Sequence, residues 1–461
     1  MRTDTIAAIA TAVSDSGIGI IRISGEDAIE VADRIYRSKN GKKKLIEVPS
    51  HTMHYGFIYD KEELIDEVMV AVMKAPNTYT KEDTVEIDCH GGILVVNRIL
   101  EATLKNGCRL AEPGEFTKRA FLNGRIDLSK AEAVMDVIHA KNEFALKASV
   151  KQLKGDVSEQ IRALREELIY EIAFIESALD DPEHISLDGY HDRLEEKSEQ
   201  ISQRLKKLID SADNGKMLKD GINTVIVGKP NAGKSSLLNA IIGEEKAIVT
   251  NVAGTTRDIL EESVKLHGIG LNIIDTAGIR DTEDIVEKIG VEKARKYASQ
   301  ADLIIYVVDS SRPLDENDEE IISIIQDKKV IVLMNKTDLT TVVEEEDIKN
   351  RFMDKDVAVI RISAKENIGI DVFEDTIKQM FFHGKIAIND EIYITNQRHK
   401  EALSDAYESM KMVLQSLADD MPEDFYSIDL MSAYASLGRI IGEEVEDDLV
   451  NEIFSKFCMG K

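Results

Sequence analysis

The stretch Gly228-Lys229-Pro230-Asn231-Ala232-Gly233-Lys234-Ser235 decides the fold of the central part of this chain. It has the pattern G-x-x-x-x-G-K-S, with the apolar run 222–227 before it and a helix-like segment, 235–241, after it. Glycines let the backbone curl so that its N–H groups face phosphate oxygens, and the dipole of the following helix favours the same charge. Lys234 can reach the β- and γ-phosphates, and the Ser235 hydroxyl can bind Mg²⁺. The stretch therefore predicts a phosphate-binding loop.

Further segments predict that the nucleotide is GTP. Asp275-Thr276-Ala277-Gly278 follows an apolar run, so that its Asp can hold Mg²⁺ through water while its Gly N–H senses the γ-phosphate. Upstream, the segment 250–258 contains Gly254-Thr255-Thr256, a flexible loop whose hydroxyl can close onto Mg²⁺. In Asn335-Lys336-Thr337-Asp338 the carboxylate can accept hydrogen bonds from guanine, and Ser363-Ala364-Lys365 gives a backbone contact to the base. Adenine would leave that carboxylate unpaired, a mismatch that can cost a factor of about 10⁴.

Hydrolysis needs a water-orienting group that these motifs do not supply. In small Ras-like switches a Gln directly follows D-x-x-G, but here that position is Ile279. The polar residues near it are Arg280, Asp281, Glu283, Asp284 and Glu287, and their spacing does not choose among them. No arginine finger is evident in the sequence either, so another positive charge must offset the charge that develops between the β- and γ-phosphates.

Length, composition and charge limit the class of protein. At 461 residues the chain is long enough for about three domains, and an apolar share of 43% allows sizeable cores. Three widely spaced cysteines, Cys89, Cys108 and Cys458, suit a reducing cytosol. No apolar run is long enough to span a bilayer and the first residues do not begin a signal peptide, so we expect a cytoplasmic protein without membrane insertion. With 58 basic and 86 acidic residues, the net charge of −28 argues against a chain that coats nucleic acid by itself.

Hydrophobic periodicity divides the chain into four segments. Residues 1–118 mix strand-like and helix-like runs, as in a small α/β or α+β domain. Residues 119–217 carry the apolar stripe of long amphipathic helices, interrupted at Asp181-Pro182, which predicts an antiparallel helical hairpin. Residues 218–380 alternate β-rich and helical segments, a pattern typical of a mainly parallel sheet with helices on both faces. The helical stripe returns in 381–461.

Individual runs give the expected elements. The strand-like runs are 18–23, 54–58, 67–73, 222–227, 271–274, 303–308, 330–333 and 357–362, and helix-like runs include 26–36 and 93–105. Because helical sequence flanks the nucleotide domain on both sides, we interpret the two flanks as one discontinuous helical bundle domain. The predicted fold class is therefore α/β and α: an N-terminal α/β domain, the helical bundle, and an inserted Ras-like P-loop domain.

The sequence resembles the MnmE (TrmE) family of tRNA-modifying GTPases nearly end to end. The nucleotide motifs alone fit several translation-related families, and motifs at the two ends make the resemblance specific. These motifs are Asp4-Thr5-Ile6-Ala7-Ala8, Gly19-Ile20-Ile21-Arg22-Ile23-Ser24-Gly25, Pro113-Gly114-Glu115-Phe116-Thr117 with Arg119-Ala120-Phe121, and Phe457-Cys458-Met459-Gly460-Lys461.

The resemblance implies that the N-terminal domain binds a folate and mediates dimerisation. By motif match the folate contacts are Arg22, Glu82, Arg125 and Lys461, although the family pattern often has Lys where this chain has Arg125. Cationic side chains suit the glutamate and the ring of a folate, here 5-formyl- or 5,10-methylene-tetrahydrofolate. Cys458 matches the family's terminal Cys and is a catalytic candidate, since a thiolate near a folate and a positive lysine would be chemically active.

The resemblance also implies how the nucleotide site is completed. Glu287 matches the family's water-orienting residue, and a K⁺ ion would occupy the place that an arginine finger fills elsewhere. The K⁺ ligands by motif match are Asn231, Thr250, Val252 and Thr255, and the Mg²⁺ ligands are Ser235 and Thr256. The GTP-binding residues are Asn231, Ala232, Gly233, Lys234, Ser235, Ser236, Thr250, Asn251, Val252, Ala253, Gly254, Thr255, Thr256, Asp275, Thr276, Ala277, Gly278, Asn335, Lys336, Asp338, Ser363 and Ala364.

The activity that the resemblance implies is K⁺-stimulated GTP hydrolysis coupled to tRNA modification. The product would be a wobble uridine with an aminomethyl or carboxymethylaminomethyl group at C5, and the folate would supply the one-carbon unit. The partners would be a second copy of the chain, tRNA, and MnmG, an FAD- and NADH-dependent protein that joins a heterotetramer and supplies much of the tRNA contact.

Two other classes of protein use some of the same features. A regulatory GTPase switch in ribosome assembly would have the same nucleotide motifs, but such proteins usually carry a basic RNA-binding appendage, which the sequence lacks. A mechanical coiled-coil GTPase would need longer and less broken helical stripes than this sequence has.

Overall fold

The computed structural model describes residues 4–140, 142–181, 183–186, 188–244, 262–266, 269–274, 301–352, 357–382, 393–443, 445, 447–457 and 460. The chain forms two compact units, one from residues 1–138, 152–198 and 408–461 and the other from residues 139–151 and 199–407. Each unit therefore combines segments that are far apart in the sequence. No described helix is both long and apolar enough to cross a membrane.

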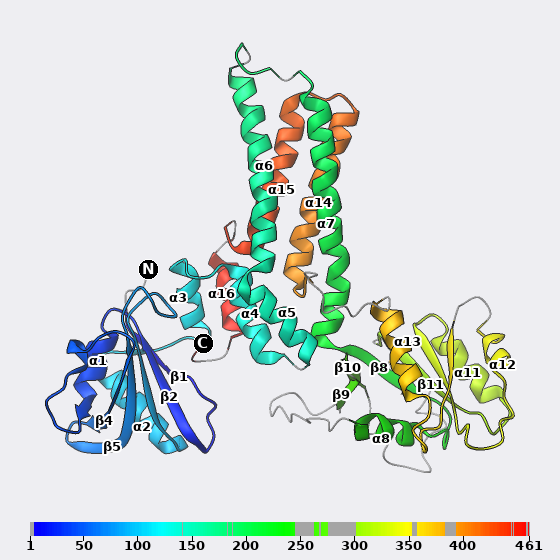
Figure 1. Cartoon of the computed structure of the whole chain (residues 1–461), viewed down its shortest axis with the longest axis horizontal. Helices are drawn as coiled ribbons and strands as arrows, with labels where there is room; N and C mark the ends of the chain where they lie inside the picture. The colour runs from blue at the N-terminus through cyan, green and yellow to red at the C-terminus, as the bar shows by residue number, and fades with distance from the viewer. Residues whose placement is uncertain are drawn as a thin grey trace. The chain divides into compact units, whose positions relative to one another are not determined.

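The first unit begins with a seven-stranded sheet and two helices (Figure 1). Its elements are β1 (Ile6–Ile9), β2 (Ser16–Ser24), α1 (Ala28–Ile35), β3 (Tyr36–Ser38), a short 3₁₀ turn (Leu45–Glu47), β4 (Thr52–Asp60), β5 (Glu63–Met73), β6 (Thr84–Gly91), α2 (Ile93–Lys105) and β7 (Arg109–Leu110). The strand order is β3-β4-β5-β6-β2-β1-β7, antiparallel throughout except for β1 with β7. The periodicity allowed an α/β or an α+β domain; because the strands are mainly antiparallel, the domain is α+β rather than the α/β type named in the predicted fold class.

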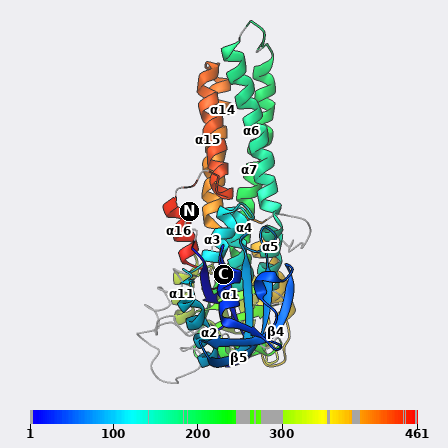
Figure 2. The same cartoon turned by 90° about the vertical axis from the view of Figure 1, so that its left-hand side faces the viewer.

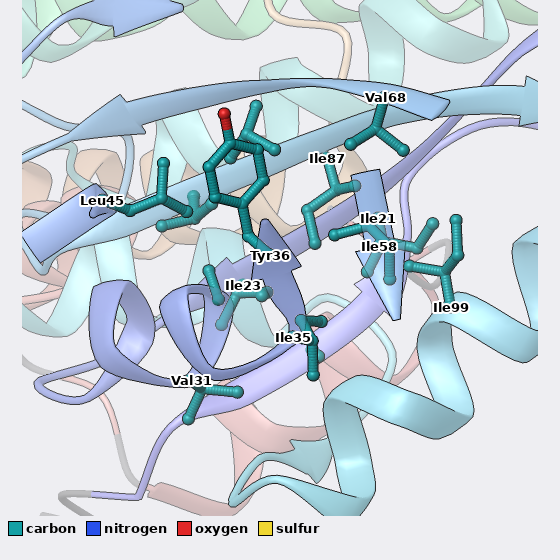
Figure 3. Close-up of a cluster of buried hydrophobic side chains, with 14 of the residues drawn as sticks. Ile21, Ile23, Val31, Ile35, Tyr36, Leu45, Ile58, Val68, Ile87 and Ile99 are labelled. Carbon is teal, nitrogen blue, oxygen red and sulfur yellow. The ribbon is translucent and has the colours of Figure 1, made fainter. Parts of the chain in front are cut away.

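Alternation along the strands makes one face of this sheet apolar. In β6, for example, Val85, Ile87 and Cys89 are buried while Glu86 and Asp88 between them are partly exposed. The apolar face packs against α1 and α2, as Figure 3 shows for Ile21, Ile23, Val31, Ile35, Tyr36, Leu45, Ile58, Val68, Ile87 and Ile99. Each large aliphatic side chain buried in this way contributes about 1.5–3 kcal/mol.

The helical part of the first unit joins two distant stretches of sequence. The remaining helices of the chain outside the nucleotide domain are α3 (Glu115–Leu122), α4 (Leu128–His139), α5 (Glu143–Lys154), α6 (Asp156–Asp180), α7 (Tyr190–Asp220), α14 (Gln397–Ala418), α15 (Glu423–Ile441) and α16 (Asp447–Ser455). Helices α6 and α15 run side by side (Figure 1 and Figure 2). Arg165 of α6 lies over the ring of Tyr434, 3.8 Å from its centroid, and forms a 3.1 Å ion pair with Glu443.

The second unit contains a six-stranded sheet covered on both faces. Its elements are β8 (Ile222–Val227), α8 (Lys234–Glu244), β9 (Glu262–Leu266), β10 (Ile269–Ile273), β11 (Leu303–Asp309), α11 (Glu316–Ile325), β12 (Val330–Asn335), α12 (Glu345–Lys349), β13 (Ala358–Arg361) and α13 (Ile370–Phe382). The order is β13-β12-β11-β8-β10-β9, parallel except for β9. Helices α8 and α13 pack on one face, and α11 and α12 on the other. The phosphate loop thus follows a central strand, where the sequence places it.

Most of the expected elements agree with the structure. The predicted runs 222–227 and 93–105 coincide with β8 and α2, and the other strand-like runs lie within or within two residues of strands. The coarse fold class, mixed α/β with an N-terminal domain and a helical part, is confirmed. The expected domain boundaries stay predictions. Residue 118 lies in α3 and residue 217 lies in α7.

Candidate functional site

The phosphate loop connects β8 to α8 in a conformation that requires small residues. Gly228 and Gly233 have φ angles of 152° and 99°, which residues with a side chain rarely adopt. A Cβ on Gly228 would collide with the carbonyl oxygen of Val307, and one on Gly233 with the side-chain amide of Asn335. Asn231 also takes a left-handed φ of 62°, which Asn tolerates better than most residues. The loop thus has the curled backbone that the pattern predicts.

Lys234 lies at the start of α8 and reaches back over the loop. Its Nζ donates hydrogen bonds to the carbonyl oxygens of Gly228, at 2.8 Å, and Lys229, at 2.9 Å. Burial lowers the pKa of this ammonium because it disfavours the charged form. Ser235 and Ser236 follow in the first turn of α8, where backbone N–H groups have no acceptor within the helix. The ammonium and the helix N-terminus together fit a bound phosphate.

Asn335 connects the phosphate loop to the segment that is expected to contact the base. Its side chain is 2% exposed; Nδ2 donates to the carbonyl oxygen of Ala232 at 2.9 Å, and Oδ1 accepts from the N–H of Ala364 at 3.0 Å. Its own carbonyl oxygen accepts a 2.7 Å hydrogen bond from the Ser310 hydroxyl. The structure therefore brings Ala232, Asn335 and Ala364 together, as the sequence motifs predict for a single nucleotide site.

Asp338 lies at the surface beside Ser363. The Ser363 hydroxyl donates to Oδ1 of Asp338 at 2.8 Å, which fixes one carboxylate oxygen and leaves the exposed group in reach of a base. Lys336, with a left-handed φ of 65°, directs its Nζ to Oδ2 of Asp309 at 2.6 Å. This arrangement fits recognition of guanine, whose N1–H and 2-amino group are both donors.

Several predicted residues lie outside the residues that the structure describes. They are Thr250, Asn251, Val252, Ala253, Gly254, Thr255, Thr256, Asp275, Thr276, Ala277, Gly278, Glu287, Cys458 and Lys461. The described members of the predicted metal sites are Asn231 for K⁺ and Ser235 for Mg²⁺, so both metal sites stay predictions.

The structure places two of the predicted folate residues against one aromatic ring. The guanidinium carbon of Arg125 is 4.4 Å from the ring centroid of Tyr79, and that of Arg22 is 5.9 Å from it. Arg22 also donates to Oε1 of Glu86 at 2.7 Å and to the carbonyl oxygen of Gly460 at 2.9 Å. The hydrogen bond to Gly460 brings the residue that precedes Lys461 in the sequence close to Arg22.

Glu82, the third described member of the folate set, belongs to a buried charge network. It accepts hydrogen bonds from Ser24 at 2.8 Å and from Nη1 of Arg119 at 3.2 Å. Arg119, whose side chain is 8% exposed, also pairs with Asp4 at 3.2 Å and Glu115 at 3.0 Å. The sequence signal for Arg119 was its place in an N-terminal motif; its role in holding Glu82 was not predicted.

A cleft of about 1210 Å³ opens beside this network. Glu82, Glu115 and Arg119 contribute to its wall, and Asn451 and Phe454 of α16 line it from the C-terminal side. The cleft shows that the charged groups around Glu82 are accessible from one side, although Arg119 itself is nearly buried.

We expect Arg119→Ala to destabilise the N-terminal domain by about 1–3 kcal/mol, because it removes the cation paired with Glu82, while Asp4 and Glu115 keep their ion pairs with Arg109. Hydrogen exchange of the β2 and α3 amides, read by mass spectrometry, measures this effect. The matched control is Arg34→Ala at the exposed pair with Glu30, where about 0–1 kcal/mol is expected. Equal protection in the two variants would contradict a structural role for the network.

The same network makes stability depend on acid pH. Burial alone would raise the pKa of Glu115, but hydrogen bonds from Arg109, the N–H of Glu112 and Arg119 lower it overall. Arg109 also lowers the pKa of Asp4. Groups with a lowered folded pKa stabilise the fold above their ordinary values, here 4.5 and 3.8, and this stabilisation is lost as the pH falls through the folded values.

We therefore expect the urea midpoint of unfolding, followed by circular dichroism, to drop as the pH falls below 4.5. Glu115→Gln removes one titrating group, so this variant starts from a lower midpoint near neutral pH and loses less of it in acid. Parallel curves for the two proteins would contradict the assignment.

Comparisons with known proteins give the relatives of this chain. A model of the MnmE helical domain matches residues 128–458, and a model of the GTP-binding protein TrmE N-terminus matches residues 5–125. Proteins named tRNA modification GTPase MnmE are 59% identical in Lachnoclostridium phytofermentans, over 100% of both chains, and 51% identical in Clostridioides difficile, over 99% of both. The protein of that name in Staphylococcus epidermidis is 47% identical over 100% of both chains.

Among solved structures, the chain aligns with translation elongation factor SelB from Methanococcus maripaludis. The TM-score is 0.26 and the identity 22%, over 36% of this chain and 35% of that one, so the likeness is weak.

Proposed function

The chain belongs to the MnmE family of tRNA modification GTPases, and on this premise we propose that it hydrolyses GTP to drive the modification of the wobble uridine of certain tRNAs. The observation that carries the proposal is the connection through Asn335. One buried side chain hydrogen-bonds both the phosphate loop, at Ala232, and the base-contact segment, at Ala364. A phosphate site and a guanine site that are coupled in this way fit a GTP hydrolase.

In the proposed hydrolysis, the chain holds the phosphates and orients water. Lys234 and the N–H groups of the loop bind the β- and γ-phosphates, and Ser235 with Thr256 holds Mg²⁺. The short amide side chain of Asn231 lies at the loop surface. Together with oxygen atoms of Thr250, Val252 and Thr255 it would hold K⁺. A K⁺ ion held there would supply positive charge that offsets the charge developing on the phosphates. Glu287 orients the attacking water.

The one-carbon chemistry belongs to the N-terminal domain in this proposal. Arg22 and Arg125, both against Tyr79, form a cationic and aromatic surface that suits the glutamate and the ring of a folate. Glu82 is held by Arg119 so that its carboxylate can accept hydrogen bonds from the ring. Lys461 and Cys458 complete the site. A bound 5-formyl- or 5,10-methylene-tetrahydrofolate supplies the one-carbon unit.

The proposed architecture is a discontinuous helical domain with an inserted Ras-like domain. The packing of α6 against α15 supports it, because these helices precede and follow the nucleotide domain in sequence. The proposed assembly is a cytoplasmic homodimer that binds MnmG in a heterotetramer. The acidic charge of −28 supports a partner that contributes basic surface for tRNA.

The cation dependence of hydrolysis tests the proposed GTPase mechanism. GTP turnover by the full chain is measured with Mg²⁺ in K⁺ and in Na⁺ at equal ionic strength. We expect faster turnover in K⁺, because Na⁺ is too small for the same set of oxygen ligands. Equal rates in the two salts would overturn the role of K⁺.

The tRNA reaction is tested in cells that lack this protein. Mass spectrometry of their tRNA nucleosides should show wobble uridines without the aminomethyl-type group, restored by the wild-type chain. Unchanged uridines would favour the alternative, a regulatory switch in ribosome assembly, and a ribosome sedimentation profile of the same cells would then show the defect.

A further inference from the structure

Lys229 stands at an unspecified position of the pattern G-x-x-x-x-G-K-S, and its side chain forms ion pairs with two aspartates. Its Nζ donates to Oδ2 of Asp315 at 2.9 Å and to Oδ2 of Asp318 at 2.7 Å. The side chain therefore ties the phosphate loop to the start of α11.

Asp318 connects the phosphate loop, β11 and α11. The residue is 1% exposed; its Oδ1 accepts a 2.7 Å hydrogen bond from the hydroxyl of Tyr306, a fully buried residue of β11. Its Oδ2 accepts from Lys229 and also from the N–H of Asp315, which closes the capping box at the start of α11. A buried carboxylate with all of these partners has a single low-energy position.

The backbone of Lys229 faces the phosphate side. Its carbonyl oxygen accepts the 2.9 Å hydrogen bond from Lys234 and a 3.2 Å hydrogen bond from the N–H of Ala232. The neighbouring Gly228 and Asn231 have φ angles of 152° and 62°. The position of this carbonyl, and through it the direction of Lys234, thus depends on where the Lys229 side chain is anchored.

We propose that Lys229 is a positioning residue for phosphate binding: its ion pairs with Asp318 and Asp315 hold the loop against β11 and α11 so that Lys234 meets the β-phosphate. The inference rests on the proposed nucleotide site and adds to it a residue that no motif assigns. A purely structural ion pair would stabilise α11 without any preference for the phosphate part of the ligand.

The test compares GDP with GMP, which share the base and differ in the β-phosphate. Isothermal titration calorimetry on the full chain measures the Kd directly for GDP and by displacement for GMP. For Lys229→Met we expect the Kd of GDP to rise about tenfold while that of GMP changes less than about twofold. Lys229→Arg should restore most of the GDP affinity, because a guanidinium can reach both carboxylates. Lys349→Met, on exposed α12, is the matched control and should change neither Kd.

Every outcome of these titrations either supports or overturns the role of Lys229. Equal loss of GDP and GMP affinity, or no loss, in a folded Lys229→Met protein would overturn the inference and leave the proposed GTPase intact. Failure of the wild-type chain to bind GDP would overturn the proposed function and the inference together. If Lys229→Met does not fold, Asp315→Asn removes one of the two charges and keeps the cap of α11. It should then weaken GDP selectively and by a smaller factor, and an unchanged GDP-to-GMP ratio would overturn the inference.

Discussion

Replacing Asp338 by asparagine is expected to reverse the nucleotide preference from GTP to xanthosine triphosphate. The carboxylate accepts from N1–H and the 2-amino group of guanine, while the Ser363 hydroxyl holds its Oδ1 at 2.8 Å. An asparagine keeps an acceptor for Ser363 but presents an NH₂ group to the base, where the 2-amino group of guanine is also a donor. Xanthine has a carbonyl at that position. Mismatches of this kind change discrimination by about 10⁴-fold.

Calorimetric titration of both triphosphates, with Mg²⁺ and a non-hydrolysable linkage, measures the effect. The control Asp371→Asn makes the same chemical change in the exposed first turn of α13 and should leave the preference for GTP unchanged. If Asp338→Asn still prefers GTP, the base is recognised elsewhere.

Lys234→Ala is expected to weaken GTP binding by roughly 10²–10⁴-fold. In the structure this ammonium holds two loop carbonyls, and in the nucleotide complex it would instead meet the β- and γ-phosphates. Two hydrogen bonds between charged groups contribute about 1.5–3 kcal/mol each, and roughly 1.4 kcal/mol corresponds to a tenfold change in Kd. The loss should be confined to ligands with at least two phosphates.

Fluorescence titration with a labelled GTP analogue tests this expectation, with Lys349→Ala as a control for the loss of one lysine from the same unit. Circular dichroism shows whether the Lys234→Ala chain keeps its fold. A folded variant with wild-type affinity would mean that the loop binds the phosphates through backbone N–H groups alone.

Local patterns in the sequence predicted the elements that hold the nucleotide. The run 222–227 is mostly β-branched, and it is followed by glycines that only a curled loop needs, so β8, the loop and α8 could be placed together. The alternation of Val85, Ile87 and Cys89 with charged residues is itself the pattern of a half-buried strand, although β6 was not among the predicted runs. The two residues of β7 carry no period at all and become a strand by pairing with β1.

Contacts between distant segments could not be predicted in the same way. Arg119 is buried between Glu115, one turn earlier in α3, and Asp4 and Glu82, which lie far away in the sequence, so the local pattern cannot show which carboxylates it meets. Lys229 is similar, since the acid that anchors it lies 89 residues further along the chain. Such residues are found from side-chain geometry, while the motif residues are found from spacing.

The hydrogen bond from Arg22 to the carbonyl of Gly460 also limits when the contacts of Arg22 can be completed during synthesis on the ribosome. The two residues are 438 positions apart, and a ribosome adds about 5–20 residues per second, so Arg22 waits roughly twenty to ninety seconds for this partner. During that interval the N-terminal sheet can already have formed, but its cationic and aromatic surface is incomplete. Until Gly460 has been added, the hydrogen bond from Arg22 to Glu86 can form but the one to Gly460 cannot, so the surface beside Tyr79 acquires its last described contact late in synthesis.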